Sequence, residues 1–282
     1  MSQDFESTAE NDNSDLTVKK EILRLGDWQV GAFIFLPDPK RPIKKALGIF
    51  SHGYTSHKGT LLTWASRLAF EGMPCIIFDL PGHYLGSFNE VEDFEEFKQN
   101  SHLLFEVALN SLQEHFLVTY PLYADYLEDS EMTYVTGGHS LGALLSIKAL
   151  TLASFKLRAS LSIAVGLGLT EVSGGGHIFE TPFYKSTLNL RRQLVSPALA
   201  PVNVFGWIQN EKKNISVTGL KVHIIVGQDD LVAGPQAANY LKVILESKGN
   251  QVSLETPTRL PHHMPELAAS LIKRYLRQAT II

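Results

Sequence analysis

Short apolar runs alternate with segments of helical period along most of this chain. Residues 46–51 and 75–78 are continuous apolar runs, a pattern typical of strands that are buried on both faces. The segments from about 60 to 71 and from about 93 to 116 repeat apolar residues at three- and four-residue spacing, which predicts helices. The same reasoning predicts a short strand around Tyr134 and Val135, strands at 157–165, 220–226 and 251–256, and helices at 141–150, 235–248 and 265–277.

This order predicts an α/β protein with a mainly parallel twisted sheet and helices on both faces. At the start of the chain, runs 16–25 and 28–36 flank Gly26-Asp27, and their alternation predicts an N-terminal antiparallel hairpin at the edge of that sheet. At 282 residues the chain is long enough for one large domain, which we assign to residues 16–282.

Two segments depart from this rhythm. Residues 1–15 are acidic and polar, so they bury too little apolar surface to offset their ordering entropy, and we expect a mobile tail. Residues 166 to 218 contain several aromatic residues, several prolines and the triplet Gly174-Gly175-Gly176, without a clean period. We interpret this stretch as a small lid insertion above the rim that carries the candidate site, and its glycines as a hinge rather than a phosphate cradle.

One serine lies where the central strand meets a helix. The sequence Gly138-His139-Ser140-Leu141-Gly142 is a G-x-S-x-G element, and its glycines leave no Cβ where a very tight turn crowds the backbone. Such a strained turn exposes the serine hydroxyl. The alternative interpretation is an N-cap serine that accepts a hydrogen bond from a helix amide.

A serine hydroxyl needs a base to act as a nucleophile, and the base needs an acceptor that holds its tautomer. Two later strand-end loops carry these residue types. One loop contains Asp229 and Asp230, and the other contains His262 and His263. The spacing alone leaves open which member of each pair serves.

The order Ser, Asp, His and the motifs around it resemble the α/β-hydrolase superfamily over about residues 16–280. The motifs are Gly138–Gly142, His52-Gly53, the stretch from Asp79 to His83, the Gly-x-x-Asp of Gly227 to Asp230, and the His-x-Pro of His263 to Pro265. This resemblance implies that Ser140, Asp230 and His263 form a catalytic triad. It also implies that the backbone N–H groups of Tyr54 and Leu141 form an oxyanion hole and that no cofactor is required.

The remaining histidines have plainer interpretations. His52 is interpreted as a loop organiser hydrogen-bonded to backbone, and Asp79 as structural. His57, His83 and His139 either line the pocket or simply pack. The sequence has no His-Glu-x-x-His and no closely spaced His/Cys set, so it predicts no metal site.

The composition and charge of the chain limit the classes of partner that we expect. The formal net charge is −4 without a basic stripe, so nucleic acid and acidic lipid have no electrostatic support as partners. Cys75 is the only cysteine, and the chain as written shows neither a signal peptide nor a membrane span, so we expect a cytoplasmic protein.

These features predict a serine hydrolase that cleaves carboxylic esters through an acyl-enzyme, with a small-molecule ester as its partner. A serine peptidase or a thioesterase would use the same triad. A non-catalytic α/β-hydrolase-fold protein that binds a ligand is an alternative of another class. The sequence leaves the acyl chain length, the physiological substrate and the oligomeric state open.

Overall fold

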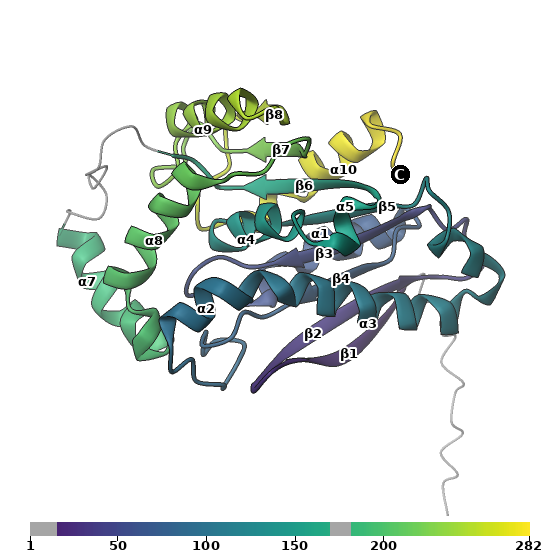
Figure 1. Cartoon of the computed structure of the whole chain (residues 1–282), viewed down its shortest axis with the longest axis horizontal. Coiled ribbons are helices and arrows are strands. Elements are labelled where there is room, and N and C mark those ends of the chain that lie inside the picture. Colours follow the sequence, from purple (N-terminus) through teal and green to yellow (C-terminus); the bar gives the residue numbers. More distant parts are fainter. Residues whose placement is uncertain (1–15, 170–181) are drawn as a thin grey trace, which may run out of the picture.

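The computed structural model describes residues 16–169 and 182–282 (Figure 1). An eight-stranded sheet crosses the molecule in the order β1-β2-β4-β3-β5-β6-β7-β8. The predicted mobile tail (1–15) and the glycine triplet (174–176) lie outside the described residues.

The sheet is mainly parallel with an antiparallel edge, as the sequence predicts. β1 pairs with β2 and β2 with β4 in antiparallel register, while every further neighbouring pair from β4 to β8 is parallel. The strands are β1 (Leu16–Leu25), β2 (Trp28–Pro37), β3 (Ala46–Ser51), β4 (Cys75–Phe78), β5 (Thr133–His139), β6 (Ala159–Val165), β7 (Lys221–Ile225) and β8 (Gln251–Glu255).

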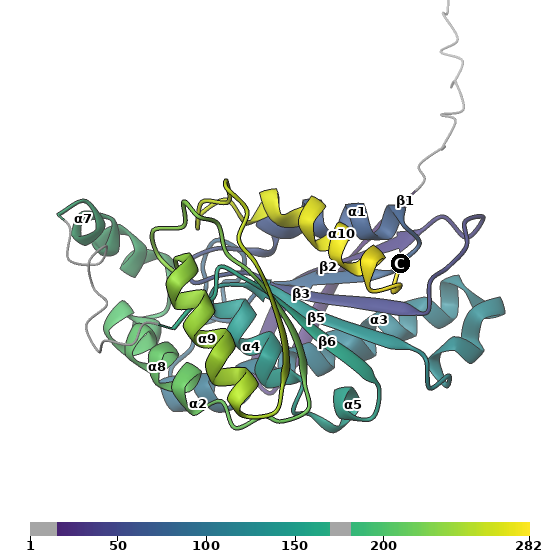
Figure 2. The same cartoon turned by 90° about the horizontal axis from the view of Figure 1, so that it is seen from above.

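Helices cover both faces of the sheet. α1 (Leu62–Phe70) and α10 (Ala269–Gln278) lie together on one face, opposite the face covered by α3 and α4 (Figure 2). The further helices are α2 (Phe94–Asn100), α3 (Leu104–Thr119), α4 (Leu141–Ala149), α5 (Ala153–Lys156), α7 (Pro182–Arg191), α8 (Pro201–Asn214) and α9 (Pro235–Ser247). Short 3-10 helices are η1 (Lys58–Leu61), η2 (Ser101–Leu103), η3 (Pro121–Leu127), η4 (Arg192–Leu194), η5 (Pro197–Leu199) and η6 (Pro265–Ala268).

The buried strands explain why both faces need cover. In β4, Ile76 and Phe78 pack into the core beneath α3, whereas Cys75 and Ile77 pack into the core beneath α1 and α10. Successive side chains of a strand point to opposite faces, so a continuous apolar run requires an apolar layer on each side. No helix in the described part of the chain combines the length and apolarity needed to cross a bilayer.

Two helical segments differ from the sequence predictions. The helix predicted over 93–116 is divided into α2 and α3 by η2, which begins at Ser101. The segment expected to lack a regular period contains α7 and α8. Both begin with a proline, Pro182 and Pro201, because the first position of a helix does not need an N–H donor.

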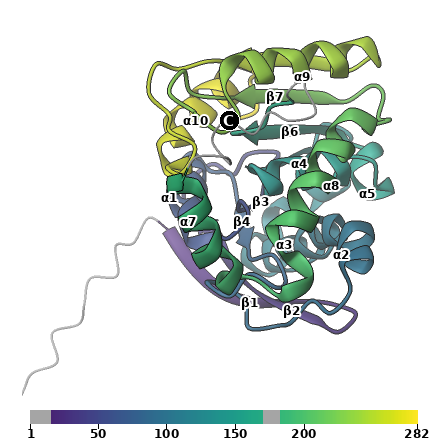
Figure 3. The same ribbon diagram turned by 90° about the vertical axis from the view of Figure 1, so that its left-hand side faces the viewer.

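The helices α7 and α8 lie at the end of the sheet where the candidate site residues were predicted. α7 and α8 stand in front of the carboxyl ends of the parallel strands (Figure 3). Loops past those strand ends gather on one rim, where open α/β sheets place their ligands. All the predicted site residues lie on this rim.

Candidate active site

A strained turn presents Ser140. β5 ends at His139 and α4 begins at Leu141, so one residue makes the reversal, with φ 50° and ψ −107°. A serine with positive φ is unfavourable unless its surroundings impose it. The Ser140 amide donates to the carbonyl of Val165 at 2.8 Å, and its side chain makes no capping bond to α4. The structure therefore excludes the N-cap interpretation and leaves the hydroxyl available at the rim.

Close backbone contact imposes this turn. A Cβ added to Gly138 or Gly142 would lie 2.4 Å or 2.3 Å from the carbonyl oxygen of Ser51, at the end of β3. The amide of Gly142 also donates to the carbonyl of His52 at 3.1 Å. Glycine is required at both positions because the two strand-end loops touch through their backbones.

The acid is held from both sides. Asp230 follows β7 and is buried; its Oδ1 accepts from the amides of Val232 and Ala233, both at 2.8 Å. Its Oδ2 accepts from Nδ1 of His262 at 2.9 Å. Burial raises the pKa of the Asp230 carboxyl, but the hydrogen bonds from His262 and from the two amides outweigh it and leave that pKa lowered. Asp230 is therefore an ionised acceptor at neutral pH.

The histidine that meets Asp230 is His262, and the predicted pairing of Asp230 with His263 is not what the structure shows. The Nε2 atom of His263 lies 3.4 Å from Nη2 of Arg191, on α7. Adjacent side chains diverge here because a tight turn carries them, closed by the bond from the amide of Met264 to the carbonyl of Pro261, and the two imidazole planes stand at 86°.

The pairing defines the tautomer of His262. An ionised carboxylate only accepts hydrogen bonds, so the Nδ1 atom of His262 carries the proton and Nε2 of the neutral ring is the basic nitrogen. Ser140 and His262 line one cavity of about 70 Å³, which we call the serine cavity. Asp229 has a different task, because its Oδ1 accepts from the amide of Leu260 at 2.7 Å and so holds the loop that carries His262.

A second cavity of about 320 Å³ lies beside the first, and Tyr54 lines both. Its walls include His139, Thr55, Arg191 and His263, so we call it the arginine cavity. The two cavities are therefore neighbours at the rim, and of these two the serine cavity is the one that Ser140 lines.

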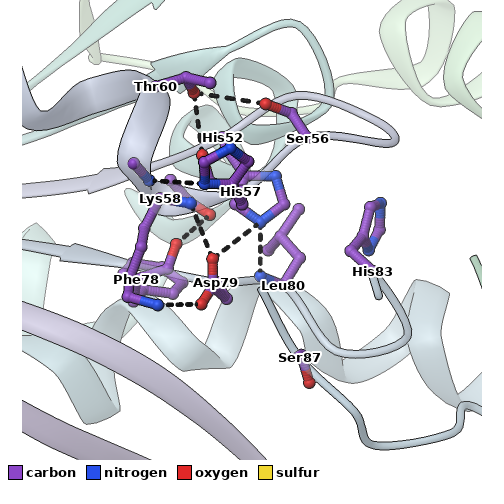
Figure 4. A network of polar contacts seen from close by, with 12 residues as sticks. His52, Ser56, His57, Lys58, Thr60, Phe78, Asp79, Leu80, His83 and Ser87 are labelled. Carbon is purple, nitrogen blue, oxygen red and sulfur yellow. Dashed lines mark hydrogen bonds and ion pairs between the residues drawn. The ribbon is translucent and has the colours of Figure 1, made fainter. Parts of the chain in front are cut away.

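A buried polar network supports the loop that carries Tyr54 (Figure 4). His52 donates from Nδ1 to the carbonyl of Gly53 at 2.8 Å and accepts at Nε2 from the amide of Leu80 at 2.9 Å. Oδ1 of Asp79 accepts from the amide of Lys58 at 2.7 Å, and its Oδ2 accepts from Nζ of Lys58 at 2.5 Å. These bonds confirm that His52 organises a loop and that Asp79 is structural.

The contacts of the other three histidines that the sequence analysis named differ from one another. His139 lines the arginine cavity, with its ring centroid 4.7 Å from that of His262. His57 accepts from the amide of Gly59 and so caps η1. His83 packs edge-on against His52 and donates to the carbonyl of Pro81. Among the described residues, no group of three or more His, Cys, Asp and Glu side chains is arranged to hold a metal ion.

Sequence reasoning placed residues 166 to 218 above the rim but did not predict that part of this stretch forms the helix α8. Phe205, Ile208, Gln209 and Lys212 all line the serine cavity, and their spacing places them on one helical face. That spacing could have identified the helix, but prolines and a glycine in the same stretch obscured it.

Comparisons with known proteins agree with the architecture. No family model and no curated protein sequence matches the chain. Its structure is similar to the esterase Pf2001 of Pyrococcus furiosus (TM-score 0.59, 16% identity, 93% of this chain and 90% of that chain). It is also similar to a soluble variant of the monoglyceride lipase of Saccharomyces cerevisiae (0.61, 14%, 92% and 94%) and to XC6422 of Xanthomonas campestris, an α/β serine hydrolase without a lid (0.54, 15%, 93% and 94%). The chain therefore has the α/β-hydrolase fold, as its motifs predict.

The contact at Gly138 leads to a stability prediction. Gly138→Ala should lower the free energy of unfolding by about 1–3 kcal/mol, because the new methyl group meets backbone that cannot move aside. Gly206→Ala is the matched control: it lies within α8 with nothing within 4 Å of the added Cβ, and it should raise stability by about 0.5–1 kcal/mol. Urea unfolding measures both. Equal stability of the two variants would contradict the proposed crowding.

The network of Figure 4 leads to a second prediction. Burial is the largest cause that lowers the pKa of His52 and of His83 to about 3. Because these folded pKa values lie below the unfolded value of about 6.5, the unfolded chain binds more protons, and stability falls as pH drops below about 6.5. Each of the two histidines lowers the free energy of unfolding by up to about 1.4 kcal/mol for each pH unit below that value. Thermal unfolding between pH 7 and pH 4.5 measures the effect, and a constant midpoint would refute it.

Proposed function

We propose that this protein is a serine hydrolase that cleaves carboxylic esters. The observation that carries the proposal is the hydrogen bond between Asp230 and His262, because His262 lines the same cavity as a serine held at positive φ on a strand-to-helix turn. An acid, an imidazole with a defined tautomer and an available hydroxyl are the parts that acyl transfer through serine requires.

In the proposed reaction, Nε2 of His262 removes the proton from Oγ of Ser140 as that oxygen attacks the ester carbonyl carbon. Asp230 stabilises the imidazolium that forms. The alcohol leaves with the proton from His262, and a water molecule activated by the same imidazole then releases the acid from the acyl-enzyme. No cofactor enters these steps.

The oxyanion of the tetrahedral intermediate would accept hydrogen bonds from the amides of Tyr54 and Leu141. Leu141 is the first residue of α4, where the backbone amides lack an intrahelical acceptor and where the positive end of the helix dipole lies. The Tyr54 loop is held by His52 and by the bond from the Tyr54 hydroxyl to the carbonyl of Leu199 at 2.7 Å. Donors fixed before the reaction stabilise the developing charge without reorganisation.

We also propose that α7 and α8 act as the lid, because α8 lines the serine cavity together with Ser140 and α7 lines the neighbouring arginine cavity. A serine peptidase or a thioesterase would use the same residues. The substrate series described next separates these activities.

Reaction with a fluorophosphonate tests the nucleophile. Folded protein should be labelled at Ser140, and Ser140→Ala should remove the label, because Ser140 shares the serine cavity with the proposed base His262. Mass spectrometry of peptides measures the site. Absence of label on folded protein would favour a non-catalytic ligand-binding protein.

A series of p-nitrophenyl esters, acyl thioesters and aminoacyl amides then defines the bond cleaved, and turnover of amides or thioesters alone would displace the esterase assignment.

Paired substitutions test which histidine is the base. His262→Asn should lower kcat for ester hydrolysis by about 10³-fold or more, because the Asp230 carboxylate loses the imidazole that it orients. His263→Asn should retain kcat within about tenfold, because that ring contacts Arg191 instead. Steady-state kinetics on variants with confirmed circular dichroism spectra measures both. The reverse order of effects would restore His263 as the base.

A further inference from the structure

α8 carries a buried lysine into the serine cavity. Lys212 is 5% exposed, and its Nζ atom donates to the carbonyl of Gly168, in the segment after β6. Lys212 and Gly168 line the cavity together with Ser140 and His262. The proposed hydrolysis gives this cation no task.

No carboxylate compensates the charge of Lys212 among residues 16–169 and 182–282. By contrast, Lys58 pairs with Asp79, and Lys148 pairs with Glu211, the residue directly before Lys212. Burial lowers the pKa of Lys212 to about 8, so the amine remains mainly protonated at neutral pH. An ammonium buried without a counter-ion carries a desolvation cost, and an anion that enters the site would offset that cost.

A second polar group points to the same requirement. Gln209 precedes Lys212 by three residues on α8 and lines the same cavity, and its Oε1 atom is buried without a hydrogen-bond partner. Rotation of the amide replaces Oε1 by Nε2 with almost no change of shape, so Gln209 can offer a second donor to an anion held by Lys212.

We propose that the serine cavity binds a carboxylate on the ester substrate, with Lys212 as the group that selects it. The proposal rests on the function assigned above and narrows it to short carboxylate-bearing esters, either half-esters of dicarboxylic acids or acyl esters of hydroxy acids. The cavity of about 70 Å³ admits only a short segment. Its apolar wall, with Phe205 and Ile208, strengthens the attraction between the two charges because it excludes water.

Matched substrates test the selection. Mono-p-nitrophenyl glutarate and p-nitrophenyl pentanoate differ mainly in a carboxylate on the acyl side, and 3-acetoxypropanoate and propyl acetate differ in the same way on the alcohol side. Wild-type protein should prefer the anionic member of at least one pair. Lys212→Met should lower kcat/KM for that ester by about 10- to 100-fold, since a charge-assisted hydrogen bond is lost, and should change kcat/KM for the neutral ester by less than about threefold.

Lys213→Met is the control, because Lys213 is the exposed neighbour on the same helix and should leave both values unchanged. A wild type without preference for either anionic ester would overturn the proposal. So would an equal loss for anionic and neutral esters in a Lys212→Met protein that fluorophosphonate still labels.

Binding separates this inference from the proposed hydrolysis. Ser140→Ala protein should show a higher melting temperature with glutarate than with neutral glutaramide, and adding Lys212→Met should remove the difference. That result would support the carboxylate site even if no ester is hydrolysed. Equal effects of glutarate and glutaramide on the Ser140→Ala protein would overturn it, and this comparison needs no Lys212 variant to fold.

Discussion

The contact between two strand-end loops is the constraint on which the site depends. The turn after β5 lies against the carbonyl groups of Ser51 and His52 at the end of β3, and only glycine at 138 and 142 permits that approach. The contact holds Ser140 at positive φ and brings the first amide of α4 near the loop of Tyr54. The proposed nucleophile and both proposed oxyanion donors are therefore positioned by one backbone interface.

Burial and partners divide the histidines into supports and candidates for chemistry. His52 has both ring nitrogens engaged by backbone and is surrounded by core, so a proton can neither arrive nor leave without disturbing the loop. His262 has one nitrogen fixed by Asp230 and the other available beside a cavity. A base must exchange its proton during each cycle, and only the second environment permits this.

The elements built from a regular pattern could be predicted from the sequence. Strands 46–51 and 75–78 agree with β3 and β4 at both ends, because a buried strand requires an unbroken apolar run. The base could not be assigned in the same way. The His-x-Pro of His263 to Pro265 indicates the loop, but the choice between the neighbouring histidines depends on a turn whose geometry follows from tertiary contacts, including the bond from Trp64 to the carbonyl of Pro265.

The inserted helices show why specificity is harder to predict than chemistry. The proposed triad lies on loops whose places are set by the sheet, so residue types and chain order indicate which loops to compare. The walls of the serine cavity come partly from α8, whose cavity-facing residues are an aromatic, an aliphatic, an amide and a lysine. Such a mixed face has no clear apolar stripe, because a face that contacts a polar ligand need not be apolar. The proposed selection of a carboxylate by Lys212 would thus depend on α8, the helix whose hydrophobic pattern is weakest. The proposed triad lies elsewhere, on the loops that follow the strands of the sheet.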